Sequence, residues 1–287
     1  MSNKKAKSLR QSYPLALTVA GSDSGGGAGI EADLRTFNAF GVFGSCAITA
    51  VTSQNPRQVT RIDKLSAESV KTQIDAVAAC FSPAFVKSGM LADPETVEVL
   101  ADAVKRYKMN LICDPVLMAT SGAALGEEKL VDALSKRLLP CAAWITPNVP
   151  EAEKLLGCKR KISTEQELFD AAKELYDRYG ASVLLKGGHL NLPEAADAVC
   201  RGGKMFKLTS PKVDIPPYAG HGTGCTLSAA LTAGLVLDYP WKQALCEAKS
   251  FVLGSLTQNV ELADGVFAMY PPTEDCYDLI KLESAEG

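Results

Sequence analysis

Short apolar runs alternate with helical patterns along this sequence, and the alternation restricts the folds that the chain can form. The strands predicted from these runs are Leu15–Ala20, Ser45–Val51, Ala84–Lys87, Asn110–Cys113, Ala143–Thr146 and Ser182–Lys186. Alternating strands and helices are typical of βα units around a mostly parallel sheet. Strands this apolar are usually covered on both faces. The sequence therefore predicts an α/β fold built as a three-layer α/β/α sandwich.

Helical periodicity fills the intervals between these strands. In the first interval, Ile30, Leu34 and Phe37 keep the i, i+4, i+7 spacing of a buried stripe. The helices are expected over residues 29–40, 66–80, 94–107, 127–138, 148–156, 164–179, 224–237 and 241–261. Two weaker strands, 196–200 and 204–208, flank a Gly-Gly turn and predict a hairpin.

The domain organisation is expected to be simple, because no repeat or low-complexity linker divides the chain. We predict a disordered tail at 1–12, a single domain at 13–265 and a peripheral, acidic tail at 266–287. No apolar run in the sequence is long enough to suggest a signal peptide or a membrane span. The interpretation is a cytoplasmic protein.

Charge and cysteine usage narrow the function. The formal charge of −3 provides no basic field that would gather a nucleic acid, so a small-molecule substrate is favoured. The nine cysteines are odd in number and scattered, and none forms a Cys-x-x-Cys pair. This pattern argues against a disulfide framework or a structural zinc site and is consistent with a reducing compartment.

Ligands of open parallel sheets bind beyond the carboxyl ends of the strands, so the residues that follow each strand are the candidates. The segment Gly21–Gly29 after the first strand holds five glycines in nine residues. It is either a flexible turn or a loop that approaches a ligand closely. Ile30 stands where the dinucleotide-binding pattern requires glycine, and no Walker A pattern occurs, which disfavours a Rossmann dehydrogenase and a P-loop kinase.

Three later strand ends carry polar residues with two interpretations each. Asp114, before Pro115, is either a turn former or a carboxylate for Mg²⁺. Asn148 and Glu151 have capping-box spacing, and a helix start of that kind also attracts phosphate. Lys186, before two glycines, either reaches a polyphosphate or extends to solvent.

The segment 220–226, Gly-His-Gly-Thr-Gly-Cys-Thr, is the most informative, because it leads directly into a long apolar helix. Alternating glycines at a helix start expose several backbone N–H groups to one point, and the helix dipole adds positive charge there. The expected result is an anion hole for a transferred phosphoryl group. Cys225 would stand in the first helical turn, where a lowered thiol pKa is expected. A buried, inert cysteine is the alternative.

Taken in order, these segments resemble a known family. The motifs that carry the resemblance are Ala20-Gly21-Ser22-Asp23 through Gly29, Lys87-Ser88-Gly89-Met90-Leu91, Asp114-Pro115-Val116, Thr146-Pro147-Asn148-x-Pro150-Glu151-Ala152, Lys186-Gly187-Gly188-His189 and His221-Gly222-Thr223-Gly224-Cys225-Thr226. The chain resembles the hydroxymethylpyrimidine/phosphomethylpyrimidine kinases of thiamine biosynthesis, members of the ribokinase superfamily, over residues 14–262. Six motifs in series are far more specific than any one of them.

The resemblance implies an activity and a set of site residues. It implies ATP- and Mg²⁺-dependent phosphorylation of 4-amino-5-hydroxymethyl-2-methylpyrimidine and then of its monophosphate, by a homodimer with the ribokinase-like fold. The residues implied to line the pyrimidine site are Ala28, Asp33, Gln54, Met90, Val116 and Cys225. Those implied to face ATP are Asn148, Lys186, Gly220 and Thr223, and those near Mg²⁺ are Asp114 and Glu151. Cys225, with Gly222 and Gly224 in the anion hole, is implied to be catalytic.

Three alternatives compete with this hypothesis. A pyridoxal kinase of the same subgroup would also have a cysteine in the glycine loop, but such enzymes tend to carry a second cysteine in the flap, which at 117–122 has none. A sugar kinase is disfavoured because it would have an aspartate in place of Cys225. A non-catalytic nucleotide-binding regulator is disfavoured by the intact set of carboxylates, lysine and glycine loop.

Overall fold

The computed structural model describes residues 13–285 except 118–123, 158–160 and 189. The predicted N-terminal tail, most of the predicted flap and His189 therefore lie outside the described residues. Among those described, no helix combines the length and the apolar character needed to cross a lipid bilayer.

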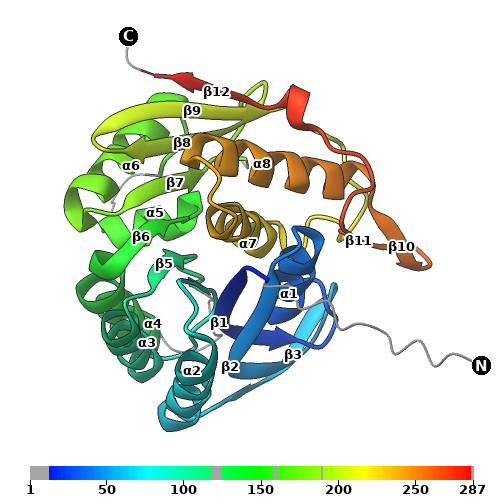
Figure 1. Cartoon of the computed structure of the whole chain (residues 1–287). Coiled ribbons are helices and arrows are strands. Elements are labelled where there is room, and N and C mark those ends of the chain that lie inside the picture. Colours follow the sequence, from blue (N-terminus) through cyan, green and yellow to red (C-terminus); the bar gives the residue numbers. More distant parts are fainter. Residues whose placement is uncertain (1–12, 118–123, 158–160, 189, 286–287) are drawn as a thin grey trace, which may run out of the picture.

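A ten-stranded sheet forms the middle of the molecule, in the order β12-β9-β8-β7-β6-β5-β4-β1-β2-β3 (Figure 1). Its strands are β1 (Leu15–Asp23), β2 (Phe43–Asn55), β3 (Gln58–Lys64), β4 (Phe85–Ser88), β5 (Asn110–Cys113), β6 (Ala142–Ile145), β7 (Ser182–Lys186), β8 (Ala195–Arg201), β9 (Lys204–Ser210) and β12 (Lys281–Ser284). The six central strands, β7, β6, β5, β4, β1 and β2, are parallel to one another. Antiparallel strands extend the sheet at both edges, β3 on one side and β8, β9 and β12 on the other. The predicted mostly parallel sheet is confirmed.

Helices cover both faces of this sheet, as Figure 1 shows. They are α1 (Gly29–Ala39), α2 (Ala67–Phe81), α3 (Pro94–Tyr107), α4 (Ala124–Ala133), α5 (Val149–Leu156), α6 (Glu165–Tyr179), α7 (Thr223–Val236) and α8 (Trp241–Thr257). One face is packed by α2 to α6 around residues such as Ile74, Leu100 and Leu168, and the other by α1, α7 and α8 around Phe37 and Leu231. The three-layer sandwich is therefore confirmed.

Four strands differ from the sequence prediction, and each has little buried apolar surface. Strand β3 is exposed along almost its whole length and forms one edge of the sheet, so it lacks the apolar alternation that reveals a half-buried strand. Strand β12, from the acidic C-terminal tail, pairs with β9 at the opposite edge. The small hairpin of β10 (Val260–Ala263) and β11 (Val266–Ala268) begins where α8 was expected to continue.

The order of the strands determines where a ligand can bind. From β1 the chain adds β2 on one side, and after β3 it crosses to add β4 on the other side of β1. Crevices form at the carboxyl ends of strands where the direction of addition reverses. Helix α7, in the layer with α1 and α8, packs against β1, β4 and β5. Its N-terminus therefore lies at the carboxyl ends of these strands.

Candidate active site

A cavity of about 250 Å³ lies at this edge, below the carboxyl ends of β1, β2, β4, β5, β6 and β7. The predicted site residues that line it are Ala28, Gln54, Met90, Asp114, Val116, Asn148, Glu151, Lys186, Gly222, Thr223, Gly224 and Cys225. Gly220 lines an adjoining cavity of about 570 Å³, which shares Asn148, Lys186, Thr223 and Gly224 with the first. Segments that are far apart in the sequence therefore meet at one place, and the two cavities open onto the same helix N-terminus.

Asp33 does not line the cavity, contrary to the prediction. Its side chain is fully buried, and its Oδ2 accepts hydrogen bonds from the hydroxyl of Thr18 at 2.6 Å and from Nζ of Lys87 at 2.8 Å. Lys87 is fully buried as well. In this structure Asp33 is the counterion of a buried lysine. A lysine at the end of the apolar strand 84–87 was the sequence signal for such a partner.

The glycine loop leads directly into the N-terminus of α7. Gly222 precedes the helix with φ of 87°, a left-handed conformation that favours glycine, and no side chain of a described residue caps the helix. A Cβ on Gly224 would lie 3.2 Å from Nζ of Lys186 and 3.8 Å from Oδ2 of Asp114. Glycine at 224 thus leaves the helix N-terminus open toward a lysine and a carboxylate, and an anion placed there would meet amide hydrogens and a cation together.

Asp114, Glu151 and Lys186 form the charged part of the cavity. Nζ of Lys186 donates to Oδ1 of Asp114 at 2.8 Å, and the hydroxyl of Thr146 donates to the same oxygen at 3.1 Å. Burial would lower the pKa of Lys186, but Asp114 and Glu151 raise it above its usual range, so the side chain is a cation. Burial raises the pKa of Glu151 to about 7, with Lys186 opposing and Asp114 adding to the shift.

These carboxylates are suited to a cation that brings its own ligands. Among the described residues, no group of three or more histidine, cysteine, aspartate or glutamate side chains is arranged to hold a metal ion by itself. Mg²⁺ usually takes one or two protein carboxylates and completes its octahedron with water and phosphate oxygens. The elevated pKa of Glu151 is also the response of a carboxylate buried beside a second one. The residues present therefore fit an ion that arrives with a polyphosphate.

Asn148 and Glu151 have a structural role in addition. The Asn148 amide oxygen accepts from the Glu151 backbone N–H at 2.9 Å, and Glu151 Oε2 accepts from the Asn148 backbone N–H at 2.8 Å. This reciprocal pair is a complete capping box at the start of α5. Both residues also line the cavity, so the two interpretations of this motif are compatible.

Cys225 lies in the first turn of α7 and lines the cavity together with Gln54. The expected lowering of its thiol pKa is not found. Burial raises the pKa of Cys225 above its ordinary value, and the nearby Lys87, together with a hydrogen bond from the Gly29 backbone, only partly offsets this. Asp33 and Asp114 add negative charge nearby and contribute to the elevation. The helix N-terminus alone does not make a thiolate where the thiol is desolvated beside carboxylates.

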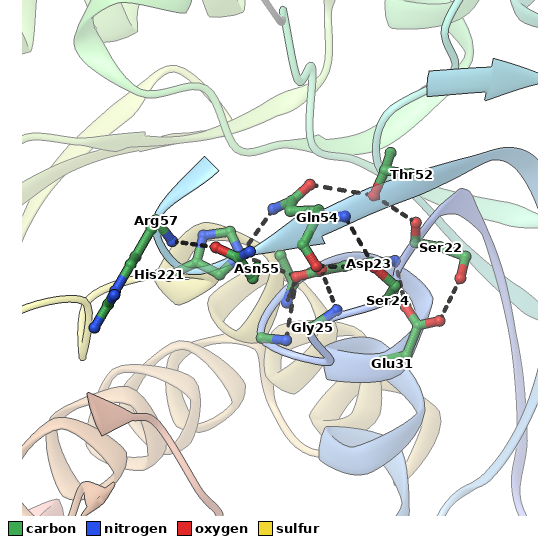
Figure 2. A network of polar contacts seen from close by, with 12 residues as sticks. Ser22, Asp23, Ser24, Gly25, Glu31, Thr52, Gln54, Asn55, Arg57 and His221 are labelled. Atoms are coloured by element: carbon green, nitrogen blue, oxygen red, sulfur yellow. Dashed lines mark hydrogen bonds and ion pairs between the residues drawn. The ribbon is translucent and has the colours of Figure 1, made fainter. Parts of the chain in front are cut away.

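Asp23, Gln54 and His221 form a polar network that the sequence did not predict as a unit (Figure 2). Nε2 of His221 lies 2.9 Å from Oδ2 of Asp23 and 3.0 Å from the side-chain carboxamide of Gln54. The backbone N–H groups that donate to the Asp23 carboxylate are those of Gly25, Gly27 and Ala28. Burial would raise the pKa of Asp23, but the hydrogen bonds from His221 and the backbone lower it. The network ties the glycine loop after β1 to the loop before α7.

Substituting Gly222 with alanine is expected to lower kcat/KM for the phosphoryl transfer that the family resemblance implies by about 100-fold, while the protein stays folded. The new Cβ would overlap the carbonyl oxygen of Gly27 in a left-handed backbone, so the loop before α7 must move, and a displacement near 1 Å can cost that much in rate. The control is Gly41→Ala, which has φ of 74° but no heavy atom within 4 Å of its Cβ. Steady-state kinetics and thermal unfolding of both variants provide the measurement. Equal activity in the two variants would contradict a role of the loop before α7 in the reaction.

Two solved structures similar to this chain are a pyridoxal kinase and a phosphomethylpyrimidine kinase. The pyridoxal kinase of Staphylococcus aureus in complex with AMP-PCP and pyridoxal aligns with a TM-score of 0.85 and 27% identity, over 96% of this chain and all of that one. The phosphomethylpyrimidine kinase of Clostridium difficile aligns with a TM-score of 0.70 and 38% identity, over 83% of this chain and 97% of that one. The fold and the cavity thus define an α/β phosphotransferase of the ribokinase-like class.

Sequence similarity then selects the family within this class. The phosphomethylpyrimidine kinase model matches residues 23–269. The hydroxymethylpyrimidine/phosphomethylpyrimidine kinase of Rhizobium meliloti is 42% identical over 88% of this chain and 94% of its own length. The protein with that name in Haemophilus influenzae is 42% identical over 87% and 93%. The chain belongs to the phosphomethylpyrimidine kinase family.

Proposed function

We propose that the chain transfers the γ-phosphoryl group of ATP to 4-amino-5-hydroxymethyl-2-methylpyrimidine and then to the resulting monophosphate. The observation that carries the proposal is the open N-terminus of α7, which faces Lys186 and Asp114 on one side and the cavity containing Gln54 and Cys225 on the other. A hydroxyl group in that cavity would lie next to a binding place for a phosphoryl group. This is the relation that direct transfer requires.

The smaller cavity is proposed to hold the acceptor. Ala28, Met90 and Val116 supply apolar contacts, and the carboxamide of Gln54 supplies a donor and an acceptor for a heterocycle with an amino group beside a ring nitrogen. The adjoining cavity is proposed to hold ATP, with Gly220 and Thr223 near its phosphates. This arrangement brings the acceptor and the donor to the shared residues Gly224, Asn148 and Lys186.

Residues of the loop and the carboxylates are proposed to share the chemistry. The amides at the start of α7 and Lys186 stabilise negative charge on the phosphoryl group during transfer. Mg²⁺, held near Asp114 and Glu151, would neutralise charge on the nucleotide phosphates. Cys225, as the thiolate, would accept the proton of the attacking hydroxyl. Because the second acceptor is already an anionic phosphate, that step needs little help from a base.

The assignment extends to the setting in which the enzyme acts. We propose a homodimer, as the family resemblance implies, and a cytoplasmic location, as the cysteine usage suggests. The free cysteines among the described residues are consistent with a reducing compartment. Light scattering at several concentrations would test the dimer.

One coupled assay tests the acceptor. The release of ADP is measured with the pyrimidine alcohol, with its monophosphate and with pyridoxal, and we expect the highest kcat/KM for the two pyrimidines. Pyridoxal is the competing acceptor because the pyridoxal kinase of Staphylococcus aureus has so similar a structure. A clear preference for pyridoxal would overturn the proposal. ATP binding with no release of ADP in the presence of any of the three acceptors would instead favour a regulatory protein.

A further inference from the structure

One nitrogen of His221, Nε2, lies between a carboxylate, which requires a hydrogen-bond donor, and an amide nitrogen as drawn, which requires an acceptor. Nε2 is 2.9 Å from the Asp23 carboxylate and 3.0 Å from the Gln54 carboxamide, as Figure 2 shows. A ring nitrogen either carries a hydrogen and donates, or has a free lone pair and accepts. It cannot donate to Asp23 and accept from an amide N–H at once.

Asp23 decides the tautomer of the ring. Its carboxylate is almost fully buried and accepts three backbone N–H groups of the glycine loop, so it is held as an anion that can only accept hydrogen bonds. A bare Nε2 at 2.9 Å would place two lone pairs against each other. Nε2 of His221 must therefore carry the hydrogen and donate it to Asp23.

The position of the His221 ring is fixed by packing against the glycine loop. A Cβ on Gly27 would lie 2.6 Å from Cδ2 of His221, so the imidazole packs directly on the backbone of the glycine loop. Glycine at 27 is the residue that allows this contact. The N–H of Nε2 therefore has a defined place as well as a defined partner.

This tautomer determines the orientation of the Gln54 carboxamide. An Nε2–H cannot accept an amide hydrogen, so the end of the carboxamide next to His221 must be the oxygen. Oxygen and nitrogen of a carboxamide occupy nearly the same volume, and their hydrogen-bond partners decide which is which. In Figure 2 the nitrogen of Gln54 is drawn next to His221 and the oxygen next to Thr52. The hydrogen-bond partners require these two atoms to exchange places.

The other end of the carboxamide leads to the same orientation independently. It lies 3.2 Å from the hydroxyl oxygen of Thr52, and that hydroxyl is also 2.9 Å from the carbonyl oxygen of Ser22. The carbonyl can only accept and is the nearer of the two, so the hydroxyl proton is directed to it. Thr52 therefore donates to Ser22 and accepts from the amide nitrogen of Gln54.

We propose that His221, held by Asp23, is a positioning residue that orients the Gln54 carboxamide for recognition of the acceptor. The hydrogen on Nε2 of His221 is shared between Asp23 and one lone pair of Oε1 in a three-centre bond, and Thr52 takes one amide hydrogen. This leaves one acceptor and one donor of the carboxamide for a ligand. A heterocycle with an amino group next to a ring nitrogen matches that pair. This assignment rests on the proposed function of the cavity, in which Gln54 contacts the acceptor.

The tautomer can be observed directly in the intact, ligand-free protein. The chain has two histidines, so a His189→Gln variant labelled with ¹⁵N contains a single imidazole to assign. We expect the neutral ring of His221 to show a protonated Nε2 and an unprotonated Nδ1, and Asp23→Asn to abolish this preference. A neutral ring with its proton on Nδ1 and none on Nε2 in the His189→Gln protein would overturn the proposal. This measurement does not depend on any activity of the protein, so it remains informative even if the proposed acceptor is wrong.

Kinetics test whether the orientation matters for the acceptor. His221→Phe keeps the ring but removes Nε2–H, and we expect KM for the pyrimidine alcohol to rise by about tenfold, the value of one hydrogen bond, with a smaller change in kcat. In a Gln54→Ala background the same substitution should leave KM unchanged, because there is no carboxamide left to orient. Equal effects in the two backgrounds would show that His221 only supports the loop, and the proposal would fail.

Discussion

Cys225→Ala is expected to slow phosphorylation of the hydroxymethyl acceptor by about 10²–10⁴-fold, the usual contribution of a positioned base. Phosphorylation of the monophosphate should fall much less, because its attacking oxygen is already anionic. Single-turnover rates with each acceptor provide the comparison. Cys246→Ala is the control, since that thiol lies on α8 and does not line either cavity. Comparable losses in both steps would contradict a base at position 225.

The pH dependence of the same reaction supplies a second check. Burial raises the pKa of Cys225, so most of this thiol is protonated at neutral pH and the reactive thiolate is the minor form. The rate of the first phosphorylation should therefore increase with pH from neutral into the alkaline range. Cys225→Ala should remove this increase. The second phosphorylation should show little of it in either protein.

Lys87→Met is expected to destabilise the protein by about 3–5 kcal/mol, because it leaves the Asp33 carboxylate buried without its counterion. Burial would lower the pKa of Lys87, but Asp33 raises it, so the lysine is a cation and its loss removes a full charge. Oδ1 of Asp33 has no hydrogen-bond partner among the described residues, and Oδ2 would keep only the neutral hydroxyl of Thr18. Denaturant unfolding of the two proteins measures the effect.

The double variant Lys87→Met/Asp33→Leu separates a broken ion pair from a poor fit of the new side chain. Replacing both members of a buried pair by apolar residues is often neutral, so most of the lost stability should return. Lys71→Met is a matched surface control, because its pair with Asp75 is half exposed and such pairs contribute about 0–1 kcal/mol. A double variant as unstable as Lys87→Met alone would contradict the explanation.

Much of the site followed from the sequence, because the carboxyl ends of parallel strands share one edge of the sheet. Asp114, Asn148 and Lys186 were predicted from their positions after apolar strands, and all three line the cavity. The glycine loop was predicted from its place before an apolar helix, and Gly222 has the left-handed φ that this requires. These predictions needed only strand ends and a helix start, which are local features.

The edges of the sheet were missed for the opposite reason. Strand β3 and strand β12 are exposed, so no apolar pattern distinguishes them from a polar loop. They become strands because a neighbour, β2 or β9, supplies backbone hydrogen bonds across the sheet. For β12 this partner is remote in the sequence, so no local pattern could reveal it.

The apolar strands, the helices that cover them and the polar residues at the strand ends can be inferred from spacing along the chain. Charge and protonation cannot, because they depend on groups that only folding brings together. Asp33 became the partner of a lysine 54 positions away, and Asp23 holds a histidine 198 positions away. Burial then raised the pKa of Cys225 against the expectation from its place on a helix. Desolvation and distance in space act on each ionisable group, and neither is written in the order of the residues.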